Sequence, residues 1–140
     1  MSLHSRAKLM SLMAIGYGIF AFFWALAPYT PINLPARFIL DLLDWPLNNL
    51  GQELSPYTQW LSSIGAGLLA ALAVMLGGII APALKRGDTP TIRVGFWAMV
   101  IWYVIDSAGS IASGIPSNAA FNTLFVAPAL FAMMGAKSTS

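Results

Sequence analysis

One acidic side chain, Asp106, lies in the middle of a long apolar stretch. It is the first candidate for a binding or proton-carrying group in the apolar part of this chain. Ser110 lies one helical turn after it, and Asn118, Asn122 and Thr123 follow within the next apolar stretch. A carboxyl group among hydroxyls and amides can hold a proton, a cation or a polar ligand. It can equally be a hydrogen-bonding partner that joins two helices.

Two antiparallel helices are needed to bring these groups together. A hairpin turning near Ile115 puts a residue nine positions before the turn level with residues seven to nine positions after it, so Asn122 and Thr123 face Asp106. The preceding apolar helix starts at the same end and carries serines in its first two turns. The candidate polar, ion or ligand site therefore comprises Asp106, Ser110, Asn118, Asn122, Thr123, Ser62 and Ser63.

Asp106 has two competing interpretations. In the structural one it is neutral or hydrogen-bonded to Asn122 and the serines, and it joins helices. In the functional one it binds a proton or cation at the floor of a pocket open to the outside. We favour the structural one, because asparagine and serine at matching positions are what a satisfied hairpin requires.

Other chemistry is poorly represented. The chain has no cysteine and a single histidine, His4, close to its start. It shows no nucleophile–base pair, paired carboxylates, metal-ligand cluster or phosphate-binding loop. A net charge of +2 without a basic run does not indicate nucleic-acid binding. We therefore expect no enzyme activity, no cofactor, no metal and no nucleic acid.

The composition predicts an all-α membrane protein. Of the 140 residues, 58% are hydrophobic and only 9% are charged, which is too little charge for a soluble surface. Four apolar runs predict a single bundle of four transmembrane helices over residues 9–27, 57–84, 93–115 and 118–136, with an outer loop at 28–56. The first run could be a signal peptide, but Pro28 would follow the cleavage point, so we expect a retained span.

The basic residues predict the orientation. Six of the seven lie before the first run, between the second and third, or after the fourth. The positive-inside rule then puts both termini in the cytoplasm. The six are Arg6, Lys8, Lys85, Arg86, Arg93 and Lys137.

The long outer loop contains an amphipathic segment from Pro35 to Trp45. Arg37, Asp41 and Asp44 fall on one side of a helix there. We expect this helix to lie on the outer membrane surface, where it either caps the bundle or contacts a partner subunit or lipid. Its apolar and interfacial residues are Phe38, Ile39, Leu42, Leu43 and Trp45.

Small residues recur every four positions on the second and third runs, as at Ala66 and Ala70, Gly67 and Ala71, or Gly109 and Ser113. Such stripes allow close helix packing. They serve either packing within one bundle or formation of a homo-oligomer.

Residues 106–110 and 113–118 with Asn122, together with residues 35–46 and 60–67, resemble a group of small four-span bacterial membrane proteins without an assigned activity. The resemblance implies the four-span architecture and a bacterial inner membrane, and it brings no substrate or cofactor. We therefore expect a non-catalytic accessory or structural subunit that contacts the lipid bilayer and other membrane subunits or copies of itself. The alternative is a small oligomeric transporter or ligand-binding protein with an outward-facing site at Asp106.

Overall fold

The computed structural model describes residues 1–136, which form helices connected by turns and loops and contain no strand. In chain order the longer elements are α1 (Leu3–Trp24), α2 (Leu34–Leu43), α3 (Pro56–Met75), α5 (Thr89–Ala112) and α6 (Pro116–Met133). A short turn, η1 (Thr30–Ile32), precedes α2, and η2 (Leu76–Ile80) joins α3 to α4 (Ala81–Arg86). Lys137, which we expect at the cytoplasmic side, lies outside the described residues.

Three of the helical segments are long and apolar enough to cross a membrane: Leu3–Trp24, Pro56–Arg86 and Thr89–Ala112. The second runs through Pro82 without a break because η2 widens into a π-helical turn, where the Ala81 N–H bonds to the Leu76 carbonyl. Proline has no N–H to donate, and a π turn shifts the hydrogen-bond register just before it. The helix therefore extends to Arg86 as one element.

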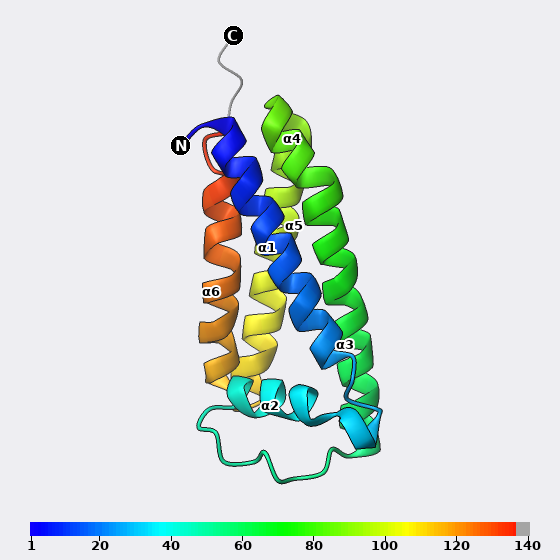
Figure 1. Ribbon diagram of the computed structural model, residues 1–140. Coiled ribbons are helices and arrows are strands. Elements are labelled where there is room, and N and C mark those ends of the chain that lie inside the picture. The colour runs from blue at the N-terminus through cyan, green and yellow to red at the C-terminus, as the bar shows by residue number, and fades with distance from the viewer. Residues whose placement is uncertain (137–140) are drawn as a thin grey trace.

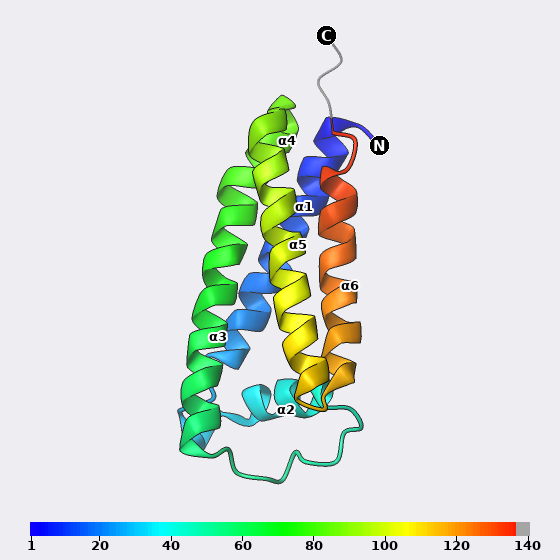
Figure 2. The ribbon, with the colours of Figure 1, turned by 180° about the vertical axis from the view of Figure 1, so that it is seen from behind.

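The long helices run side by side, and α2 lies across one end of them (Figures 1 and 2). Both ends of the described chain and the turn between α4 and α5 lie at the opposite end. We call these the α2 end and the terminal end. The expected outer loop and the expected cytoplasmic segments are thus at opposite ends of the molecule.

The core forms around α1. α3, η2 and α4 pack on one side of α1, and α6 packs on another with α5 against it. Within the described residues, α3 makes no substantial contact with α5 or α6. The largest fully buried side chains are Tyr17, Met10, Leu76, Leu84 and Met99.

Close helix approach depends on a few glycines. A Cβ on Gly65 would overlap the indole ring of Trp24, which lies across from it on α1. A Cβ on Gly95 would lie 2.5 Å from Cδ1 of Ile80. By contrast, nothing lies within 4 Å of a Cβ placed on Gly67. The packing glycines in the described bundle therefore differ from those of the predicted stripe.

Candidate functional site

Three side chains donate hydrogen bonds to one oxygen of Asp106. Asn122 Nδ2 lies 2.7 Å from Asp106 Oδ1, and Asn118 Nδ2 lies 3.0 Å from it. Ser110 Oγ is 3.3 Å from the same atom. The structure therefore brings together four of the predicted site residues, from α5 and from α6.

The local sequence explains this arrangement. Gly114 has a positive φ of 80° at the turn between the helices, a backbone conformation that glycine adopts without strain. Pro116 then begins α6, which puts Asn118 and Asn122 in its first two turns, one above the other. On α5, Asp106 and Ser110 are likewise one turn apart, so both pairs meet across the hairpin.

The four residues form a connected network. Asn118 Nδ2 also donates to Ser110 Oγ at 2.7 Å. The single hydroxyl hydrogen of Ser110 is shared between Asp106 Oδ1 and the Asp106 backbone carbonyl, which lies 2.8 Å from Oγ. Asn122 is buried and reaches Ser107 Oγ at 3.4 Å. The network is deepest at Asn122 and becomes more accessible toward Asp106, which is half-buried.

Chemically, the cluster is one carboxyl group held by amides and hydroxyls. All three side-chain bonds to Asp106 end on Oδ1, and Oδ2 remains available to another partner. No group of three or more His, Cys, Asp or Glu side chains that could hold a metal ion occurs in residues 1–136. The arrangement can fasten two helices, or it can hold a proton, a cation or a polar ligand at Oδ2.

Three other predicted site residues lie apart from this network. The Thr123 hydroxyl is 2.8 Å from that of Tyr103 and donates to the Ala119 carbonyl at 2.9 Å. Ser63 donates within its own helix to the Gln59 carbonyl at 3.0 Å. Ser62 is buried on α3, which packs on α1 rather than on the hairpin. None of the three takes part in the hydrogen-bond network of Asp106 within the described residues.

The helix expected at residues 35–45 is α2, and its sides differ from the prediction. Asp41, expected on the polar outer side, is buried and its Oδ1 accepts the backbone N–H groups of Asn48 and Asn49 at 3.1 and 2.9 Å. These two N–H donors offset part of the cost of burying the carboxylate, whose Oδ2 is buried without a hydrogen-bond partner among the described residues. Phe38 and Trp45 are exposed. Of the remaining apolar residues, Ile39 is buried, and Leu42 and Leu43 are half-buried.

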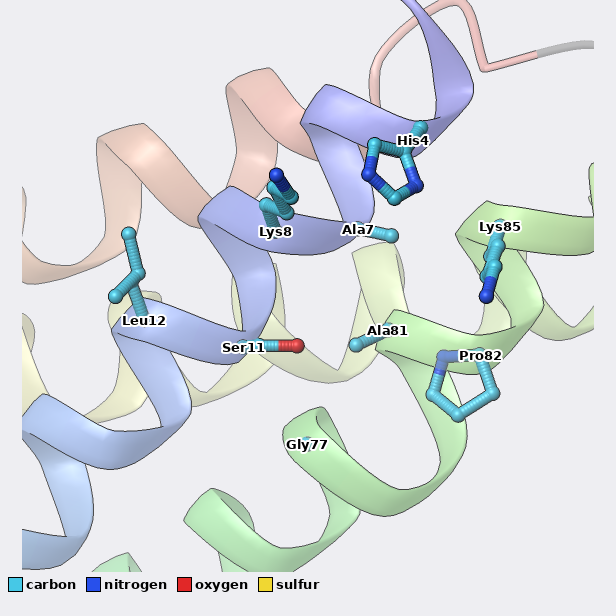
Figure 3. A pocket seen from close by; sticks show the side chains of 9 residues that line it. All are labelled: His4, Ala7, Lys8, Ser11, Leu12, Gly77, Ala81, Pro82 and Lys85. Atoms are coloured by element: carbon cyan, nitrogen blue, oxygen red, sulfur yellow. The ribbon is translucent and has the colours of Figure 1, made fainter.

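Sequence reasoning missed a groove at the terminal end between α1 and the η2–α4 segment (Figure 3). It was missed because basic residues were considered only as topology signals. His4 and Lys8 are one helical turn apart, and Lys85 ends a helix at the same side of the predicted membrane, which is a recognisable pattern. We call it the basic groove, lined by His4, Ala7, Lys8, Ser11, Leu12, Gly77, Ala81, Pro82 and Lys85.

Arg6 was also missed as a structural residue. Its Nη1 donates to the carbonyls of Phe131, Ala132 and Met134 at 3.1, 3.0 and 2.5 Å. These are free carbonyls at the C-terminal end of α6, where a positive charge is favoured. The contact fixes the start of α1 beside the end of α6.

Comparison with known proteins finds no protein family that matches the chain, no curated protein that matches it and no solved structure that matches it. The resemblance drawn from residues 106–122 therefore stays a prediction. The function has to be inferred from the geometry of the described residues.

Proposed function

We propose that the chain crosses a bacterial inner membrane four times, with both termini in the cytoplasm. Three segments have the length and apolar character of spans. The fourth, α6, has 18 residues, or about 27 Å at 1.5 Å per residue, close to the roughly 30 Å of hydrocarbon. The Arg6 contacts support an even number of crossings, because they hold the start of α1 beside the end of α6.

Cysteine labelling tests this topology cleanly, because the chain has no cysteine of its own. Single cysteines at Asn49 and Ser113 should react with a membrane-impermeant maleimide in intact spheroplasts. Cysteines at Ser5 and Met134 should react only after permeabilisation. If Met134→Cys is labelled together with Ser113→Cys in intact spheroplasts, α6 does not cross and the four-span proposal is wrong.

α2 is proposed to lie at the outer membrane surface. The exposed side chains of Phe38 and Trp45 support this position, since aromatic residues are favoured at headgroup depth. A hydrogen bond from Ser117 Oγ to the Leu43 carbonyl, 2.7 Å long, ties α2 to the start of α6. α2 therefore covers the end of the bundle rather than extending from it.

Within this architecture, we propose that the protein is a non-catalytic accessory or structural subunit of a membrane complex. The observation that carries the proposal is that α3 packs on α1 and has no substantial contact with α5 or α6 in the described residues, while only its continuation through η2 and α4 contacts α5. Its outward side carries small residues at Gly67, Ala70 and Ala71, all exposed. A small-residue face suits close packing against a helix from another protein.

α5 supports the same proposal. Its predicted small stripe, Gly109 and Ser113, is exposed instead of packing inside the bundle, as are Ala108 and Ala112 beside it. Nothing lies within 4 Å of a Cβ placed on Gly109. Such a surface suits contact with another subunit or a second copy of this chain, and the bundle itself makes no use of it.

Native mass spectrometry of the protein, gently extracted from its own membrane at natural expression level, tests the accessory role. A fixed set of other subunits at constant stoichiometry is the expected result. Gly67→Leu should lower that stoichiometry, while Leu68→Ile, a volume-conserving change at the next exposed position, should not. Recovery of this chain alone, or only with copies of itself, would refute the accessory role.

The alternative is a small oligomeric transporter or ligand-binding protein, and one observation favours it. The Asp106 carboxyl group is half-buried and uses only Oδ1 for its three side-chain bonds, so Oδ2 can take a proton, a cation or a donor from a ligand. Asp106→Asn distinguishes the two. A structural Asp106 tolerates the amide in fold and function, whereas a binding Asp106 gives a folded variant that no longer binds or transports.

A further inference from the structure

The basic groove at the terminal end combines basic side chains with small and apolar ones. Its nine lining residues include three basic side chains and no acidic one. Its volume is about 550 Å³, which is large enough for a headgroup and the start of an acyl chain. The groove is distinct from the Asp106 cluster, which lies toward the α2 end.

Small side chains hold the groove open. Ala7 and Ser11 on α1 face Ala81 on α4, and the Ser11 hydroxyl points across toward Ala81 (Figure 3). Ala7 and Ala81 are buried, so the helices touch along the floor. Gly77 lies deeper, where a Cβ would approach that of Ala14 to 3.2 Å. The result is a trough with an apolar floor.

The charges are gathered at one end of the trough. His4, Lys8 and Lys85 are all exposed, and Figure 3 shows His4 on α1 and Lys85 on α4 at opposite walls. Leu12 lies eight residues after His4 on the same helix, or about 12 Å deeper along the axis. The groove is thus polar and positive near the terminal end and apolar further in.

A phospholipid has this same distribution of charge and apolar surface. Lysine side chains extend toward the membrane surface while their stems cover apolar groups. Basic pockets between membrane helices at the cytoplasmic side fit anionic headgroups. An extended peptide fits less well, because its backbone N–H and C=O groups would lie without hydrogen-bond partners beside Leu12 at hydrocarbon depth.

We propose that the basic groove binds an anionic phospholipid. Lys8 and Lys85 contact the phosphate from the two walls, His4 contributes a further donor, and the acyl chain follows the floor past Ser11 toward Leu12. This inference rests on the proposed membrane topology, which puts the terminal end at the cytoplasmic side. It is independent of the accessory role.

The test uses the full chain in nanodiscs of equal parts phosphatidylglycerol and phosphatidylcholine, with native mass spectrometry to count the lipid that stays bound. The wild-type protein should retain one phosphatidylglycerol in preference to phosphatidylcholine. The double variant Lys8→Gln/Lys85→Gln should lower that preference about thirty-fold, because two lysines near anionic headgroups are lost. Excess inorganic phosphate should not displace the retained lipid.

The matched control is Arg86→Gln/Arg93→Gln, which removes the same charge from exposed residues of the terminal end outside the groove. It should keep the wild-type preference. Ser11→Leu fills the floor without changing charge, and it should release the lipid. Equal loss in the control and the lysine variant would overturn the proposal, as would retention by Ser11→Leu, displacement by phosphate, or no preference in the wild-type protein.

Discussion

Replacing Asp106 with alanine removes the acceptor at the centre of the polar cluster. Two donors from α6 lose their bond to Oδ1, Asn122 at 2.7 Å and Asn118 at 3.0 Å. Asn118 keeps its 2.7 Å bond to Ser110, and Asn122 keeps only a 3.4 Å contact with Ser107. The Ser110 hydroxyl still donates to the backbone carbonyl of residue 106.

The loss in stability follows from these two interhelical bonds. Such bonds average about 0.6 kcal/mol inside a membrane and reach about 1.7 kcal/mol. Asp106→Ala should therefore lower the free energy of unfolding by about 1.2 kcal/mol, with an upper bound of about 3.4 kcal/mol. Asp106→Asn retains an oxygen acceptor at the same position, so it should cost less than about 0.6 kcal/mol.

Reversible unfolding in mixed micelles, measured by circular dichroism, gives these free energies. Ser113→Ala is the control, because Ser113 is exposed near the same end of α5 and takes no part in the cluster. If the free energy of unfolding of Asp106→Ala lies within about 0.3 kcal/mol of the wild-type value, the cluster does not join the helices. If Asp106→Asn is as unstable as Asp106→Ala, the charge and not the acceptor oxygen stabilises the hairpin.

Three further predictions concern other contacts. Gly65→Ala should destabilise the fold by about 1–3 kcal/mol, because the new methyl overlaps an indole ring, whereas Gly67→Ala should be neutral in the same unfolding assay. Arg6→Gln should cost about 1–2 kcal/mol and speed amide exchange in the last turn of α6, whose carbonyls lose a charged donor. Hydrogen bonds from the Thr91 hydroxyl and then its N–H lower the pKa of Asp88. The Asp88 cap therefore stabilises α5 fully at pH values above the ordinary carboxyl pKa, and this stabilisation is lost as the pH falls through the lowered pKa of Asp88. Thr91→Val should raise the pKa of Asp88 in an NMR titration.

The Asp106 cluster was predictable because its geometry is local. Helical spacing sets Asp106 one turn from Ser110 and Asn122 one turn from Asn118, and a short turn fixes how the two pairs meet. Thr123 follows Asn122 by a single residue, about 100° around the helix, so it faces Tyr103 instead. Spacing of one helical turn therefore predicted which side chains meet better than their depth along the helix axis did.

Contacts between elements distant in sequence were not predictable in the same way. Ser62 and Ser63 lie at about the same depth as the Asp106 cluster, but depth alone does not show which helix α3 packs against. In the structure α3 packs on α1. Asp41 fits the polar side of an amphipathic helix, yet the loop that follows folds back and donates two N–H groups to it. Periodicity identifies the sides of a helix, and only the packed structure shows what covers each side.

The two ends of the molecule differ in what binding a ligand would cost. At the α2 end, Asp106 and its amide partners already bond to one another, so a ligand that competes for Oδ1 must break existing bonds. At the terminal end, Lys8 and Lys85 are exposed and give up only water when an anion arrives. Binding an anion in the basic groove therefore costs less than binding a ligand that competes for Oδ1 of Asp106. The basic groove lies between α1 and α4, and the Asp106 cluster lies between α5 and α6. The lipid proposal and the structural interpretation of Asp106 can therefore be tested independently of each other.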